Sequence, residues 1–182
     1  MHAQFDSKMK EMKKFVIPFI GLKEGKHQFE YQIDKKFFEA FQYEEFENVD
    51  VKVDLCFDKK SNLLELDFQF NGNVTIACDI SNELFNLPIK DEFKLIVKFG
   101  EVYNDERDDI LVIPHAEFQF NVSQYIYESI ILAIPAKRIH PNVMDGTLKS
   151  EVLEKLKALE VKEIKIEHID PRWDKLKNLK KT

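Results

Sequence analysis

The sequence predicts an α+β fold, mainly an antiparallel β-meander with a few packed helices, and three observations lead to this class. Along the centre of the chain, apolar and polar residues alternate strictly, as they do in half-buried strands. Short turn-forming segments separate these alternating stretches. Helical periodicity is confined to a few shorter segments. The sheet is therefore expected to have one apolar face, and it could curl into a barrel.

The first strand and the first helix are expected near the N-terminus. Every second residue is apolar or aromatic over residues 27–33, which predicts a strand. Asp34 follows this strand and can cap a helix over residues 35–44. Residues 1–12 are expected to form a flexible N-terminus.

The two central strands have the clearest pattern. Over residues 49–57 the odd positions are apolar, whereas over residues 64–70 the even positions are apolar. A tight turn at Lys60-Ser61 would pair Phe57 with Leu64 and Leu55 with Leu66. This register keeps the apolar faces together, and a slip by one residue would separate them.

A second turn is expected at Asn71-Gly72-Asn73. A two-residue Asn-Gly turn would put the next apolar residues on the wet face. A three-residue loop instead pairs Phe70 with Val74 and keeps Cys78 on the apolar face. The three-residue loop is therefore the preferred prediction.

The remaining elements follow from the same two periodicities. Further strands are expected at residues 89–99, 110–113 and 118–120, and further helices at 122–134 and 149–159. Apolar residues surround the axis of the helix at 122–134, which predicts a buried helix that Pro135 ends. The acidic segment 105–109 and the segment 141–148 are expected to be mobile loops.

The C-terminus carries the signals of a helix start. Asp170 can act as N-cap, and Pro171 suits the first helical position. Trp173, Leu176 and Leu179 follow at three-residue spacing, which predicts an apolar stripe. A helix over residues 170–182 is therefore expected to dock on the core of a single domain that spans residues 1–182.

Composition predicts a soluble, cytoplasmic protein. The chain has 182 residues, of which 44% are hydrophobic, and this length suits one domain. Its two cysteines are expected to be reduced thiols. The longest apolar run, at residues 130–136, is far shorter than the roughly 20 residues that span a bilayer. No membrane association is expected.

Charge is distributed unevenly along the chain. The net charge of −6 argues against a protein that coats DNA or RNA. Residues 8–26 and 171–182 are nevertheless basic, whereas residues 101–109 are acidic. The two basic segments could form a local phosphate-binding surface, although solvated surface lysines would give the same pattern.

Motifs for catalysis are absent from the sequence. The five glycines make neither phosphate-binding motif, and the histidines and cysteines lack the spacing of a metal site. Cys56 lies among aspartates and Cys78 ends on the apolar face, and neither environment is expected to lower the pKa of a thiol. We therefore expect a protein without enzymatic activity, catalytic residues, metal or cofactor.

Several stretches occur together in an order that is typical of one family. They are Lys14–Gly25 leading to His27-Gln28-Phe29, Cys78-Asp79, Val97–Gly100, Tyr127-Glu128, Ala133–Pro135, His140-Pro141 and Asp170–Trp173. The chain resembles the bacterial YceD family, which is named for large ribosomal RNA subunit accumulation. The resemblance covers roughly residues 14–180.

This resemblance implies a role in keeping or maturing large-subunit (23S) ribosomal RNA during ribosome biogenesis. Many members have a C-x-x-C motif where this chain has Cys78-Asp79-Ile80-Ser81. Because a serine hydroxyl is a poor zinc ligand, no metal is expected there. The family motif positions carried over are Cys78, Ser81, His140, Pro171 and Trp173, and the resemblance assigns none of them a catalytic role.

Two hypotheses about function follow. In the first, the protein is a ribosome-assembly factor that contacts ribosomal RNA or a pre-ribosomal protein through Lys137, Arg138, Arg172 and Lys175. In the alternative, it is a β-barrel module that binds an apolar ligand in a pocket lined by Phe68, Phe70 and Phe93. A filled interior would argue against the alternative. The oligomeric state stays open.

Overall fold

A computed structural model of the protein describes residues 12–107, 109–147 and 151–159. Its largest element is a six-stranded sheet within the compact unit of residues 1–147. In the order in which they pair, the strands are β2 (Gly25–Asp34), β3 (Asn48–Lys59), β4 (Leu63–Ala77), β5 (Leu84–Gly100), β7 (Ile110–Pro114) and β6 (Asn104–Arg107).

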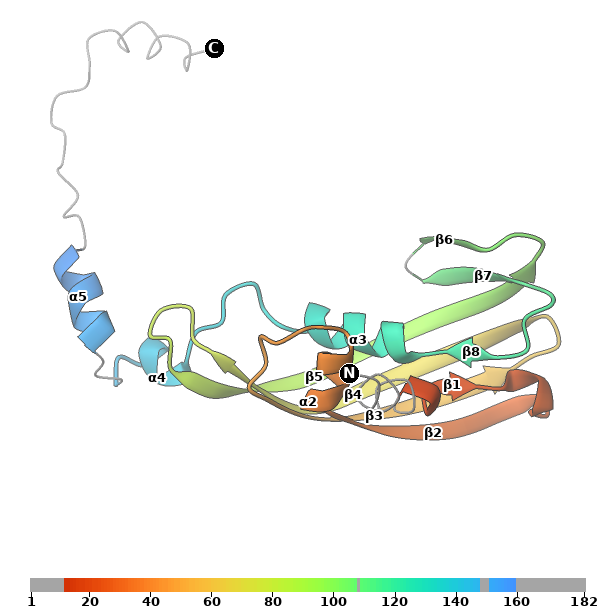
Figure 1. The fold of residues 1–182 in the computed structure, drawn as a ribbon, viewed down its shortest axis with the longest axis horizontal. Coiled ribbons are helices and arrows are strands. Elements are labelled where there is room, and N and C mark those ends of the chain that lie inside the picture. The colour runs from red at the N-terminus through yellow and green to blue at the C-terminus, as the bar shows by residue number, and fades with distance from the viewer. Residues whose placement is uncertain (1–11, 108, 148–150, 160–182) are drawn as a thin grey trace, which may run out of the picture. The chain divides into compact units, whose positions relative to one another are not determined.

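The sheet is largely antiparallel, as the sequence predicts. Only β5 and β7 pair in parallel, while β2–β3, β3–β4, β4–β5 and β6–β7 pair antiparallel. The sheet curves but does not close, because β2 and β6 are its two edge strands (Figure 1). It is therefore not a barrel.

A second layer covers one face of this sheet (Figure 1). It contains β1 (Val16–Ile17) paired with β8 (Phe120–Asn121), the 3-10 helix η1 (Phe19–Gly21), and the helices α2 (Lys35–Ala40) and α3 (Ser123–Leu132). Helix α4 (Pro141–Met144) follows in the same unit, and α5 (Glu151–Leu159) belongs to the separate unit of residues 148–182. Among the described residues, every helix is too short or too polar to span a bilayer.

Period-two alternation explains why these segments form strands and where the core lies. The inward side chains of β3 and β4 are almost completely buried, from Val49 to Phe57 on one strand and from Leu64 to Ile76 on the other. Helix α3 adds Ile126 and Ile130 to the same core. The strands predicted at residues 27–33, 49–57, 64–70, 89–99 and 110–113 are thus confirmed, whereas only Phe120 of the predicted strand 118–120 lies in a strand. Helix α3 forms within the predicted segment 122–134, but it is buried on one face only, since Gln124, Glu128 and Leu132 are exposed.

The turn predicted at Asn71-Gly72-Asn73 is wrong. Strand β4 continues through these residues, and Gly72 pairs with Val51 on one side and with Ile89 on the other. A Cβ on Gly72 would lie 2.1 Å from the carbonyl oxygen of Asp50. The glycine therefore permits a close approach of two backbones rather than a turn.

The predicted register between the central strands is off by two residues. Phe57 pairs with Leu66 and Leu55 with Phe68, and Lys60 donates to Leu63 around a turn at residues 61–62. Because a shift of two residues preserves the facing of every side chain, the buried face is unchanged.

Several predicted boundaries also differ. Asp34 caps α2, as expected, through a 3.2 Å hydrogen bond from the Phe37 amide, but the helix ends at Ala40. The segments 105–109 and 141–148, expected to be loops, contain parts of β6 and all of α4. The predicted terminal helix, with Pro171, Arg172, Trp173 and Lys175, lies outside the described residues, as do residues 1–11.

Candidate functional site

The family motif positions Cys78 and Ser81 lie at the turn between β4 and β5. The Cys78 amide donates to the Glu83 carbonyl and the Asn82 amide to the Cys78 carbonyl, both at 2.9 Å. Asn82 has a φ of 58°, a left-handed conformation that asparagine tolerates better than most residues. This turn directs the side chains of Cys78 and Ser81 inward, where they are 2% and 4% exposed.

The Cys78 sulfur accepts several hydrogen bonds. The amide of His140 donates to it at 3.2 Å. Burial raises the pKa of this thiol, but the His140 amide, the Ser81 hydroxyl and the Ser81 and Ile80 amides outweigh that effect and lower the pKa to about 7. The expectation that the surroundings of Cys78 do not lower the pKa of its thiol is therefore wrong. The sequence did not indicate the effect because the donors are mostly backbone groups.

Asp79 and Arg138 join this turn to the segment that follows α3. The Asp79 amide donates to the Arg138 carbonyl at 2.8 Å, and the Arg138 amide donates to Asp79 Oδ2 at 2.7 Å. Arg138 Nε also donates to Asp79 Oδ1 at 3.1 Å, and its Nη1 donates to Glu45 Oε2 at 2.8 Å. The backbone bond from Arg138, together with the nearby guanidinium, lowers the pKa of Asp79.

His140 completes this arrangement. Its Nδ1 accepts the Asn142 amide at 3.0 Å, so the side chain caps α4. Its ring packs against Phe85 with centroids 5.4 Å apart. We call Cys78, Asp79, Ser81, Arg138 and His140 the Cys78 cluster. Among the residues that the structure describes, no three His, Cys, Asp or Glu side chains are placed to hold a metal ion.

The predicted contact residues thus have different environments. Lys137 is exposed, whereas the side chain of Arg138 is only 32% exposed and lies between two carboxylates. Arg172 and Lys175 lie outside the described residues. The structure therefore brings Cys78, Ser81, Arg138 and His140 together. The His140 amide donates to the Cys78 sulfur, and Arg138 bonds to Asp79 of the same turn.

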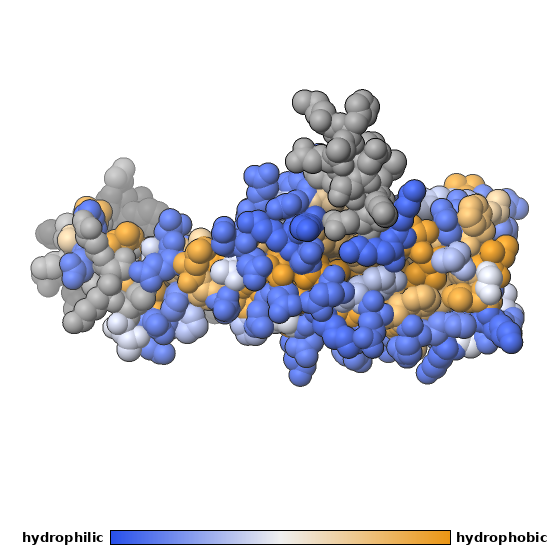
Figure 2. Space-filling model, turned by 60° about the horizontal axis from the view of Figure 1, so that its bottom comes forward, coloured by the Kyte–Doolittle hydropathy of each residue, from blue (hydrophilic) through white to orange (hydrophobic). Residues whose placement is uncertain are grey.

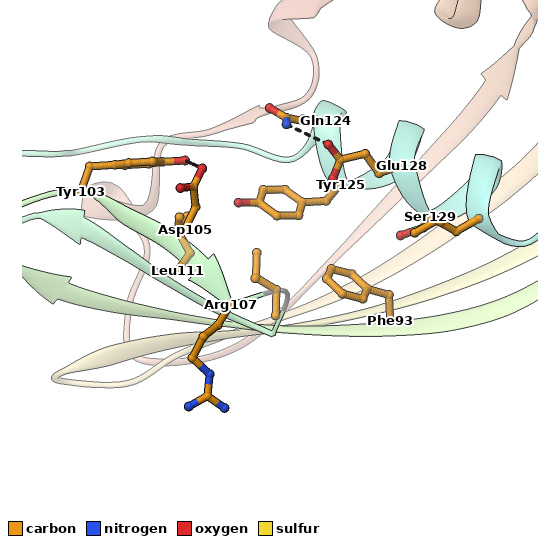
Figure 3. A pocket seen from close by; sticks show the side chains of 11 residues that line it. Phe93, Tyr103, Asp105, Arg107, Leu111, Gln124, Tyr125, Glu128 and Ser129 are labelled. Carbon is orange, nitrogen blue, oxygen red and sulfur yellow. Dashed lines mark hydrogen bonds between the residues drawn. The ribbon is translucent and has the colours of Figure 1, made fainter.

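A second feature, which the sequence did not indicate, is a pocket of about 270 Å³ between α3 and the strands β5, β6 and β7 (Figure 3). Its apolar lining includes Phe93, Leu95 and Leu111, and its polar lining includes Tyr103, Asp105, Gln124, Tyr125 and Glu128. We call this the Tyr125 pocket. The sequence predicts an acidic loop around Asp105, but the residue lies in β6, and the parallel pairing of β5 with β7 places this strand at the pocket.

Hydrogen bonds fix the polar side chains of the Tyr125 pocket. The Tyr103 hydroxyl donates to Asp105 Oδ2 at 3.3 Å, and Gln124 Nε2 donates to Glu128 Oε1 at 2.8 Å. The pKa of Tyr125 is raised to about 12. Burial is the largest cause, and Tyr103, Glu128 and Asp105 raise the pKa further. Burial is also the largest cause that raises the pKa of Tyr103, and Asp105 and Glu128 raise it further.

The uncovered face of the sheet is polar and lacks aromatic side chains. The outward positions of β2, β3, β4 and β5 hold no Phe, Tyr or Trp. Ion pairs cross this face from Lys52 to Glu30 at 3.3 Å and from Lys94 to Asp67 at 3.3 Å. Hydrophilic side chains dominate the view in Figure 2, with hydrophobic ones gathered mainly toward its right-hand end.

Comparison with known proteins identifies one family. The model of the family described as large ribosomal RNA subunit accumulation protein YceD matches residues 66–180. This segment includes the Cys78 cluster and the Tyr125 pocket. No curated protein and no solved structure matches the chain.

Proposed function

This chain belongs to the YceD family, and we propose that it is a non-enzymatic factor that supports the accumulation or maturation of large-subunit (23S) ribosomal RNA. The family's description links the protein to the large ribosomal RNA. The observation that carries the proposal is the family match over residues 66–180, which confirms the resemblance seen in the motifs. The proposed place of action is the cytoplasm, on an assembling large subunit.

Contact with a protein of the assembling subunit fits the described surface better than contact with bare RNA. Proteins that read single-stranded RNA on a sheet stack bases on exposed aromatic side chains. The outward positions of β2 to β5 provide none, and they carry many carboxylates that repel phosphate. Lys137 is an exposed cation next to the Cys78 cluster and is the residue proposed to contact a phosphate.

In this proposal the Cys78 cluster has a structural role. Its hydrogen bonds hold the turn between β4 and β5 against the segment that leaves α3. The guanidinium of Arg138 is already engaged by Asp79 and Glu45, so its proposed role is to position this segment and the neighbouring Lys137.

The alternative of an apolar-ligand module has little support. The sheet is open, so it encloses no barrel interior. Phe68 and Phe70 are each 1% exposed and pack in the core with ring centroids 6.1 Å apart. Phe93 lines the Tyr125 pocket, but that pocket is partly polar and smaller than the usual range of about 300–1,000 Å³ for small-molecule sites.

Sedimentation of cell extract on a gradient tests the proposal. At low salt the protein should migrate with particles that contain large-subunit RNA, and added salt should release it if charged contacts hold it there. The small subunit serves as the internal control for specificity. A protein that stays at the top of the gradient even at low salt would contradict the proposal.

A further inference from the structure

The Tyr125 pocket is lined by aromatic rings that are held in place. The ring of Tyr125 stacks with Phe93 at a centroid distance of 6.2 Å and with Phe120 at 5.7 Å. Tyr103 approaches from the opposite side, and the hydroxyls of the two tyrosines point toward each other in Figure 3. Because neighbours fix Tyr125, a guest would meet a preformed aromatic wall.

The pocket also carries negative charge that no cation neutralises among the described residues. Neither Asp105 nor Glu128 takes part in an ion pair there, and the hydrogen-bond donors that reach them are the neutral groups of Tyr103 and Gln124. Arg107 lies on the same rim, but its guanidinium points away from the pocket in Figure 3 and pairs with Asp109 at 3.4 Å. Although Arg107 is one of the lining residues, no cation of the described residues is paired with either carboxylate of the pocket.

From this charge complementarity we propose that the Tyr125 pocket binds an arginine side chain of a basic polypeptide partner. A guanidinium is planar, stacks on aromatic faces and donates in a fork to carboxylates, so it matches both parts of the lining. The inference rests on the proposed function, since it names the class of protein that the factor contacts.

Size and charge select this occupant over others. A volume of about 270 Å³ admits a side chain rather than a large ligand. Phosphate groups of RNA would be repelled by Asp105 and Glu128. Lysine could satisfy the charge, but its compact ammonium cannot donate in a planar fork.

A labelled peptide that alternates arginine with glycine tests the inference by fluorescence anisotropy on the full chain. Its affinity should fall about threefold to fivefold in Asp105→Asn and in Glu128→Gln, since each substitution removes one charged contact worth about 0.7–1 kcal/mol. Tyr103→Leu should weaken binding to a similar extent, and Tyr103→Phe should retain more of it because it keeps the ring.

Controls separate a specific pocket from general attraction to an acidic protein. Glu24→Gln removes the same charge at an exposed position outside the pocket and should leave the affinity within about twofold of wild type. The same peptide with citrulline in place of arginine should bind about tenfold more weakly, since it loses charge-assisted bonds. Thermal melting confirms that each variant is folded.

Equal binding of the citrulline peptide, or an equal loss in Glu24→Gln and Glu128→Gln, would overturn the inference. A protein that binds an RNA oligonucleotide but not the peptide would also overturn the inference, provided that Glu128→Gln leaves the RNA affinity unchanged. The proposed function could survive such a result, because sedimentation with ribosomal particles measures it separately. Conversely, if the protein bound the peptide but did not sediment with ribosomal particles, the result would count against the proposed function alone.

Discussion

The Cys78 cluster and the Tyr125 pocket differ in how their polar groups are satisfied. In the cluster, the sulfur, the guanidinium and the carboxylate of Asp79 all have close partners within the protein. In the pocket, Asp105 and Glu128 keep their charge without a cation among the described residues. The motif residues Cys78, Ser81 and His140 thus support the fold through contacts within the protein. The proposed partner surface lies mostly on residues outside the motifs, and Glu128 is the motif residue that belongs to it.

Removing the Cys78 side chain should give the largest effect on stability. Cys78→Ala deletes the acceptor of several buried donors and leaves a small void, so the free energy of unfolding should fall by about 2–3 kcal/mol. Cys78→Ser should lose less, because the hydroxyl can still accept. Urea unfolding of each variant measures these differences.

Cys56→Ala is the matched control, since Cys56 is half-buried on the opposite face. It should change the free energy of unfolding by less than about 0.5–1 kcal/mol. If the two alanine variants were equally stable, the donors around Cys78 would not stabilise the fold.

The same donors predict a pH dependence of stability. Burial raises the pKa of Cys78, but the hydrogen bonds lower it to about 7, below the usual value of a thiol. The folded protein therefore releases this proton more readily than the unfolded chain, and stability should rise from about pH 7 to about pH 9 and be lost as pH falls through 7.

The size of this gain should be about 1–2 kcal/mol relative to Cys78→Ser, followed by urea unfolding at several pH values. A wild-type protein whose stability runs parallel to that of Cys78→Ser across this range would contradict the lowered pKa.

Arg138→Ala should have a smaller effect. It removes the ion pairs with Asp79 and Glu45, which are partly exposed, so a loss of about 1 kcal/mol is expected. Arg138→Lys should recover part of it, because it keeps the charge but not the fork. Arg107→Ala, which breaks one exposed pair, is the control, and an equal loss there would show that the Cys78 cluster does not depend on Arg138.

Substitutions in the Tyr125 pocket should have little effect on stability, in contrast to those in the Cys78 cluster. Because no described cation pairs with Asp105 or Glu128, replacing both by Asn and Gln should change the free energy of unfolding by less than about 0.5 kcal/mol. Thermal and urea unfolding measure this. A loss above about 1 kcal/mol would show that these carboxylates support the fold, and the contrast between the two regions would disappear.

The sheet was largely predictable because period-two alternation reports directly on burial. The inward positions of β3 and β4 follow this alternation with one exception. That exception is Gly72, which lies on the buried face of β4. That glycine also explains the main error. Asn-Gly occurs both in turns and where two strands approach closely, and only the partner strand distinguishes the two cases.

The site was predictable only in part. The motif order drew attention to Cys78, Ser81 and His140, but the lowered pKa of the thiol depends on backbone amides that no side-chain pattern reveals. The Tyr125 pocket depends on the parallel pairing of β5 with β7, a long-range arrangement that local periodicity does not encode. Asp105 and Glu128, which are 23 positions apart, therefore gave no joint signal in the sequence.

Depletion of the protein in cells tests the central claim most directly. The measurement is the ratio of large-subunit to small-subunit ribosomal RNA, with re-expression of the wild-type chain as the control. A protein that supports accumulation of the large-subunit RNA should, when depleted, lower this ratio, and re-expression should restore it. An unchanged ratio after effective depletion would contradict the account.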